Sequence, residues 1–233
     1  MKFLLLISFL SIILFFGCRT NNLSKFDLNS KKMYFEEIVA SGATNIRITY
    51  SSDRPPSKDD PGGIIKDIAK GIGTAFLSAD IESKLIRAAN PDTIIQAISF
   101  GVENALVKYL NVQPQYTLNN ESEFVVTTIL EKCELVSNPN GIYISVQAEV
   151  EITQRGTGEL VWENTETNYS PIRQNYAYGT TSSSVSDVIQ ATQLATLSEP
   201  ELRTIINSAA QDVGRKMANT LREDIREALK EKK

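Results

Sequence analysis

The chain has 233 residues, of which 42% are hydrophobic and 22% are charged, and its formal net charge is −4. This composition is typical of a globular protein with enough residues for one domain and a substantial core. The sequence has no histidine, which excludes Ser-His-Asp and Cys-His catalytic arrangements and any zinc site with histidine ligands. The negative charge also argues against a nucleic-acid partner.

The first residues have the pattern of a secretory signal. Lys2 precedes an apolar run from Phe3 to Phe16, and Gly17 and Cys18 follow it. The run has fourteen residues, fewer than the roughly 20 that span a bilayer as a helix. We therefore interpret residues 1–17 as a signal peptide.

A small residue directly before a cysteine, at the end of such a signal, resembles the lipobox of bacterial lipoproteins. Phe15 stands where that family usually has leucine. The resemblance implies cleavage before Cys18, which would then carry a diacylglyceryl thioether and usually an amide-linked acyl chain. Two or more acyl chains hold a protein stably at a membrane. Arg19 after the cysteine favours the outer membrane, facing the periplasm. The alternative is an ordinary secretion signal with an incidental cysteine.

Cleavage would also remove Lys2 and change the net charge from −4 to −5. Residues 19–34 are polar and have no sustained period, so we predict a tether between the membrane and a single domain at 35–233. Within this domain a strand is predicted at Asn45 to Ser51. Residues 51–63 contain three prolines and two glycines, which predict a solvated loop.

Helical spacing begins at Ile64 and contains Gly71 and Gly73. Neither phosphate-loop motif is completed there, so the glycines predict close helix packing or a kink. A second helix is predicted from Asn90-Pro91-Asp92, with Asn as N-cap and Pro at the first helical position. Its apolar stripe is Ile94, Ile98, Val102, Ala105, Leu106 and Tyr109. The capping box Ser198-Glu199-Pro200-Glu201 begins a third helix, whose stripe continues to Leu229.

Three strands are predicted in succession, at about 123–136, 142–153 and 159–169. Turn-forming residues separate them at 138–141 and 155–158, which indicates an antiparallel meander. The middle strand alternates without a break, and its apolar side chains are Ile142, Ile144, Val146, Ala148, Val150 and Ile152. We predict a two-layer α+β fold, with an antiparallel sheet of three to four strands and helices packed on one face.

The first of these strands is apolar on both sides. Strict alternation places Val125, Ile129, Cys133 and Leu135 on one face and Phe124, Val126 and Leu130 on the other. Either the chain's own loops cover the second face, or it forms an exposed patch for a partner or an apolar ligand. Cys133 is predicted to be a buried structural thiol.

Residues 170–197 are rich in Ser, Thr, Tyr and Gln. Such a long connection is either an ordered flap or a mobile contact loop. Tyr169, Tyr176 and Tyr178 could anchor a partner there.

Carboxylates gather on the polar face of the middle strand. Glu149 and Glu151 are two residues apart, about 6.5 to 7 Å along a strand, and Glu159 and Glu163 could approach them. This spacing would suit an acid and base pair for hydrolysis, but no apolar neighbour is in place to raise a pKa. We therefore predict no catalytic, cofactor-binding or metal-binding residue and no enzymatic activity.

The order of a helix, a three-strand meander with Thr157-Gly158-Glu159-Leu160-Val161-Trp162 at its second turn, and a C-terminal helix resembles periplasmic envelope-assembly lipoproteins. These include the curli-secretion lipoprotein, lipoprotein activators of penicillin-binding proteins and auxiliary lipoproteins of lipid-moving ABC transporters. The resemblance implies a membrane-anchored, non-catalytic interaction module with an envelope protein as partner. The alternative is a carrier of lipid or another apolar ligand, and the position of Phe124, Val126, Leu130 and Trp162 distinguishes the two. The sequence indicates no oligomeric state.

Overall fold

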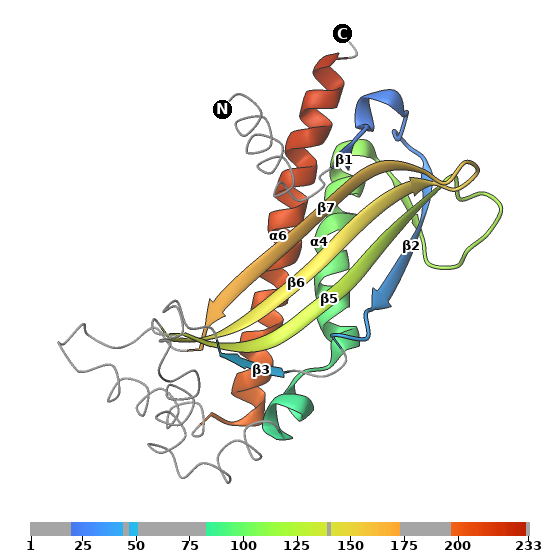
Figure 1. Ribbon diagram of the computed structural model, residues 1–233. Coiled ribbons are helices and arrows are strands. Elements are labelled where there is room, and N and C mark those ends of the chain that lie inside the picture. The colour runs from blue at the N-terminus through green and yellow to red at the C-terminus, as the bar shows by residue number, and fades with distance from the viewer. Residues whose placement is uncertain (1–19, 44–46, 51–82, 139–140, 173–196, 232–233) are drawn as a thin grey trace, which may run out of the picture.

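A seven-stranded mixed sheet forms one layer of the molecule, and two long helices cover one of its faces (Figure 1). The computed structural model describes residues 20–43, 47–50, 83–138, 141–172 and 197–231. The strands are β1 (Thr20–Asn21), β2 (Lys32–Val39), β3 (Arg47–Tyr50), β4 (Gln113–Gln115), β5 (Phe124–Asn138), β6 (Gly141–Gln154) and β7 (Glu159–Pro171). The helices are the short η2 (Leu23–Lys25), α4 (Pro91–Leu110) and α6 (Glu199–Glu231), and residues 83–88 are also helical.

The predicted meander is confirmed as the antiparallel run of β5, β6 and β7. Every second side chain of β6, from Ile144 to Ile152, is fully buried on the face that the helices cover. The turn between β6 and β7 contains Gly158 with φ of +69°, a left-handed conformation that glycine adopts without a steric penalty. The local signals of alternation and turn chemistry therefore define this half of the sheet.

The sheet is larger and more mixed than predicted. Its order is β1-β7-β6-β5-β2-β4, and β3 also pairs with β5. Strand β2 runs parallel to the first half of β5, where Met33 lies opposite Phe124, and β3 runs parallel to the second half. Parallel partners need long connections. No local turn signal could therefore reveal this pairing. The predicted α+β fold with helices on one face is confirmed, but an antiparallel sheet of three to four strands has too few strands and lacks the parallel pairs.

The predicted tether at residues 19–34 is also wrong for the residues that the structure describes. Thr20 and Asn21 pair with β7. Leu23 and Leu28 are buried in the core, and the ring of Phe26 packs edge-to-face on Phe124 with centroids 6.3 Å apart. These apolar residues follow neither a helical nor a strand period, because they lie in a short turn of helix and a loop. The absence of a period made this segment look like a linker in the sequence.

A β-bulge in β5 explains why this strand looks apolar on both sides. The register with β6 shifts between Leu130 and Lys132, so Glu131 has no opposite partner. An extra residue switches the face to which all later side chains point. Phe124, Val126 and Leu130 before the bulge, and Cys133 and Leu135 after it, therefore all lie on the helix-covered face and are buried. The predicted grouping of Cys133 and Leu135 with Val125 and Ile129 was wrong.

Both long helices begin where their capping residues predict. The side chain of Asn90 accepts hydrogen bonds from the backbone N of Asp92 at 3.0 Å and of Thr93 at 3.4 Å. Before α6, the backbone N of Ser198 donates to Glu201 Oε2 at 2.8 Å, and the backbone N of Glu201 donates to Ser198 Oγ at 3.4 Å. With 33 residues, α6 is about 50 Å long.

The two helices meet backbone to backbone at a pair of glycines. A Cβ atom on Gly101 would lie 2.7 Å from the carbonyl carbon and oxygen of Gly214. A Cβ atom on Gly214 would lie 2.8 Å from the carbonyl oxygen of Ile98. This contact fixes how α4 and α6 lie across the sheet. Gly71 and Gly73, for which close packing or a kink was predicted, lie outside the described residues.

Candidate functional site

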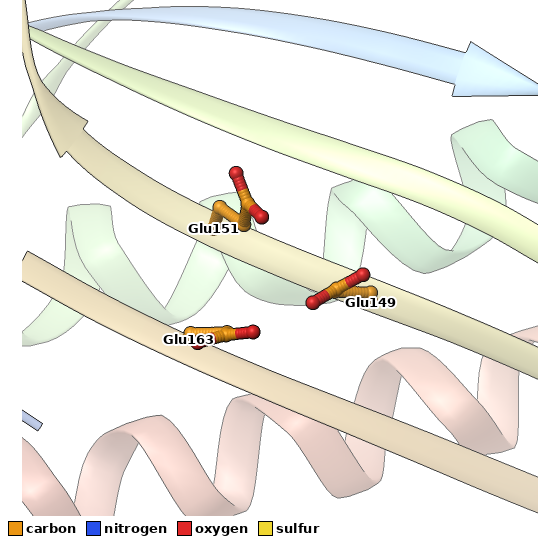
Figure 2. Close-up of side chains that lie close together, drawn as sticks. All are labelled: Glu149, Glu151 and Glu163. Atoms are coloured by element: carbon orange, nitrogen blue, oxygen red, sulfur yellow. The ribbon is translucent and has the colours of Figure 1, made fainter. Parts of the chain in front are cut away.

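The outer face of the sheet, opposite the helices, carries a cluster of glutamates. Glu151 on β6 lies opposite Glu163 on β7, and Glu149 lies two residues along β6. Figure 2 shows the three carboxyl groups close together, and each offers an oxygen within 4.8 Å of the others. The predicted approach of Glu163 to the pair is confirmed. Glu159 lies at the start of β7, opposite Gln154, and is not part of the group.

The acidic cluster, defined as Glu131, Glu149, Glu151 and Glu163, favours a bound proton. The pKa of Glu149 is raised to about 7, first by partial burial, then by its hydrogen bond with Glu163, and then by the charges of the other three glutamates. Within the described residues none of the four forms a salt bridge. Their neutral partners are Gln147, which donates to Glu131, and Thr20, whose Oγ1 donates to Glu163 at 3.2 Å.

This arrangement can hold a proton between Glu149 and Glu163. Carboxylate oxygens are also the ligands that Ca²⁺ and Mg²⁺ prefer. Glu149, Glu151 and Glu163 are half-buried on an open sheet face, which suits them both to share a proton and to bind a cation. A hydrolytic acid and base would additionally need a substrate held between the two carboxyl groups. Glu149 and Glu163 instead lie close together, with carboxyl oxygens within 4.8 Å of each other.

The structure places four of the predicted partner-surface residues in the core. Phe124, Val126, Leu130 and Trp162 are at most 3% exposed, because α4 and α6 cover this face. Of the two alternatives for the first strand, coverage by the chain itself is correct, although helices rather than loops provide it. An exposed patch made of these four residues is wrong.

The three predicted tyrosine anchors have different outcomes. Tyr169 lies near the end of β7 and is 60% exposed, so it remains accessible to a partner. Tyr176 and Tyr178 lie outside the described residues, as does most of the segment at 170–197.

Trp162 instead links the sheet to α6. Its Nε1 donates a hydrogen bond of 2.8 Å to Oδ2 of Asp224, and both side chains are buried. A buried indole N–H needs such an acceptor. Cys133 is 1% exposed, and burial raises the pKa of its thiol to about 12, with a smaller contribution from Glu134. The predicted buried thiol is confirmed.

An exposed apolar patch on α4 was missed by the sequence analysis. Phe100 is 64% exposed, Val107 is 40% exposed, and Tyr116, just after β4, is 71% exposed. The Tyr116 hydroxyl donates to Glu103 Oε1 at 2.7 Å, which links Tyr116 to the helix turn between Phe100 and Val107. We call Phe100, Val107 and Tyr116 the α4 patch. Phe100 and Val107 are seven residues apart on the side opposite the buried stripe, and a helical projection would have shown them.

No described helix is both long enough and apolar enough to cross a bilayer. Cys18, the predicted lipid-attachment residue, lies outside the described residues, two positions before β1. The prediction of a lipid anchor therefore rests on the signal pattern. The structure shows that the chain two residues after Cys18 already pairs with β7.

No family model matches the sequence, and no curated protein matches it. Solved structures do show similarity. A Xanthomonas campestris protein of the family DUF330 has a TM-score of 0.41 and 8% identity, over 88% of this chain and 90% of that one. The PelC dodecamer from Paraburkholderia phytofirmans gives 0.33 and 11%, over 85% and 93%. A Caulobacter crescentus protein, provisionally assigned as a lipoprotein, gives 0.28 and 11%, over 63% and 96%. Identities and TM-scores this low assign no function.

Proposed function

We propose that the protein is a lipoprotein of the bacterial cell envelope that Cys18 anchors in the outer membrane, facing the periplasm. There it acts as a non-catalytic interaction module in envelope assembly or maintenance. The single observation that supports the interaction role is the α4 patch, because Phe100 on α4 and Tyr116, which is hydrogen-bonded to the same helix, are both large exposed aromatic side chains.

The α4 patch has the properties of a binding anchor. Aromatic side chains dominate the binding energy of many protein interfaces. The hydrogen bond from Tyr116 to Glu103 is also the main cause of the raised pKa of Tyr116, and it fixes the ring before a partner arrives. A side chain that is already ordered loses less conformational entropy on binding. The patch therefore suits a protein partner with a complementary apolar surface.

The alternative, a carrier of lipid or another apolar ligand, has weaker support. A carrier needs an apolar space for its ligand. The side chains named for that role, Phe124, Val126, Leu130 and Trp162, are buried against the chain itself. To separate the two functions, the variant Cys18→Ala is purified and extracted with organic solvent, and the extract is analysed for lipid. The interaction module should yield little lipid, whereas a carrier should yield a near-stoichiometric amount.

Membrane fractionation tests the anchor. We expect the wild-type protein to remain with membranes after a high-salt wash and Cys18→Ala to move into the soluble fraction. Retention of Cys18→Ala in washed membranes would contradict anchoring by lipid. Cys133→Ala is the matched control, because its thiol is buried and its loss should leave the distribution unchanged.

Site-specific photo-crosslinking in native cells tests the docking surface. A photoreactive residue at Phe100 should give a discrete adduct with one envelope protein. The same residue at Glu223 on α6, whose side chain is 64% exposed, is the control for random contact and should give none. If the adduct forms at Tyr169 but not at Phe100, the partner contacts β7 and the α4 patch is not the docking surface. Equal labelling at all three positions would contradict a specific partner.

A further inference from the structure

The chain enters the fold almost immediately after the predicted lipid-attachment residue. Thr20 pairs with Glu163 in β7. Asn22 continues along the same strand, where its backbone N donates to the Val161 oxygen at 2.8 Å and its Nδ2 donates to the Leu160 oxygen at 3.0 Å. Only Arg19 separates Cys18 from β1. Because consecutive Cα atoms are 3.8 Å apart, the Cα of Cys18 lies within about 8 Å of that of Thr20.

This short reach sets the distance between the domain and the membrane. The polar headgroup region of a bilayer is roughly 6 Å thick on each side of the hydrocarbon core. A lipid on Cys18 would have its acyl chains in that core and its thioether close to the boundary. Thr20 and the start of β7 would then lie at the headgroup layer, because no tether is left to hold the domain away from the membrane.

An apolar cleft opens at the same end of the molecule. We call it the η2 cleft. Figure 1 shows η2 beside the C-terminal part of α6. The cleft lies between the loop after η2 and the ends of the two long helices, and its apolar lining includes Leu23, Phe26, Leu28, Leu110, Ile225 and Leu229.

The rim of the η2 cleft suits the membrane interface. Leu229, on the lining of the cleft, is 50% exposed. Lys25 and Lys230, both exposed, are the sequence neighbours of the lining residues Phe26 and Leu229, and Asp27 also lies on the lining. Interfacial binding combines buried apolar area with attraction of basic side chains to anionic headgroups.

We propose that this end of the domain rests on the bilayer, with Leu229 and the rim of the η2 cleft in contact with lipid acyl chains. The proposal rests on the proposed function, since the lipid on Cys18 brings this end to the membrane. It fixes the orientation of the protein: the C-terminal end of α6 faces the bilayer, and the end of β7 near Tyr169 points away from it (Figure 1).

Fluorescence quenching with the lipidated, full-length protein tests this orientation. The variants Leu229→Cys and Tyr169→Cys are purified from native membranes, labelled with a thiol-reactive fluorophore and reconstituted into vesicles of phosphatidylethanolamine and phosphatidylglycerol. Cys133 is 1% exposed and stays unlabelled, and Cys18 is blocked by its lipid. A quencher attached to lipid acyl chains should reduce the emission at Leu229 at least twofold more than at Tyr169, and aqueous iodide should show the reverse order.

Flotation of the vesicles separates the two proposals. If the protein floats with the vesicles while iodide quenches both labels equally, the lipid anchor stands and the proposed contact is wrong. If the protein carries no lipid and does not float, the proposed function fails and this contact fails with it. Lys25→Cys, at an exposed position, is a second reporter. It should respond as Leu229 does, and an aqueous response at both positions would overturn the proposal.

Discussion

The two faces of the central sheet come from the same strands and have opposite chemistry. On the inner face, β6 contributes five fully buried apolar side chains, from Ile144 to Ile152, to a core that two helices close. On the outer face, the alternate residues of the same strand include Glu149 and Glu151, which lie among further glutamates without a salt bridge in the described part of the chain. The inner face stabilises the fold, whereas the outer face carries charge that opposes it.

The largest effect is expected where the helices that cover the inner face touch. Gly214→Ala would place a Cβ atom 2.8 Å from the backbone oxygen of Ile98, and a backbone atom cannot move aside as a side chain can. Although alanine is the better helix former, we expect a net loss of about 3 kcal/mol in the free energy of unfolding, measured by urea denaturation. Gly156→Ala is the control, because nothing lies within 4 Å of its added Cβ. Equal stability of the two variants would contradict the backbone contact.

An intermediate effect is expected at the link between the sheet and α6. Trp162→Phe keeps an aromatic ring in the core but removes the 2.8 Å hydrogen bond to Asp224. We expect a loss of about 2 kcal/mol, because a buried carboxyl oxygen loses a donor. A double-mutant cycle with Asp224→Leu should show a coupling of about 1 kcal/mol or more. Strictly additive effects would mean that the hydrogen bond contributes nothing.

The smallest effect is expected on the outer face, and it should depend on pH. The pKa of Glu149 is raised from 4.5 to about 7, so the folded protein binds this proton more tightly than the unfolded chain does. Glu149 therefore does not lower the free energy of unfolding below pH 4.5. The free energy of unfolding falls as the pH rises from 4.5 to 7, and the loss is complete above pH 7. Glu149→Gln should stabilise the protein by about 1 kcal/mol at pH 8, after allowance for solvent screening.

The same substitution should change stability little at pH 4.5, which urea denaturation at the two pH values would show. Glu159→Gln, at an exposed position outside the acidic cluster, is the matched control and should show no comparable pH dependence. An equal stabilisation by Glu149→Gln at both pH values would argue against a shared proton between Glu149 and Glu163.

The inner face could largely be predicted from the sequence, because local signals define it. Asn90 and the Ser198 and Glu201 pair mark the starts of the helices, and the unbroken alternation of β6 gives its buried side. The prediction failed for the second half of β5, because the bulged residue Glu131 reverses the face to which all later side chains point. Strand β2 was missed because the inward pair Met33 and Phe35 is too short a pattern, and its partner strand is about 90 residues away.

The functional surfaces were less predictable, because they depend on contacts between distant residues. The approach of Glu163 to Glu149 followed from the short turn between their strands. The hydrogen bond between Trp162 and Asp224 spans 62 positions, and no sequence pattern marks it. The α4 patch was missed because only the buried stripe of the helix was considered, and the role of Tyr116 depends on its bond to Glu103.

We propose that a lipid on Cys18 holds this domain against a membrane, where its outward surfaces meet a partner. Mass spectrometry of the N-terminal peptide from the native cell tests this most directly. We predict a mature chain that begins at Cys18 and carries the added mass of a diacylglyceryl group on its sulfur. A free thiol at Cys18, or a chain that still contains residues 1–17, would contradict the account.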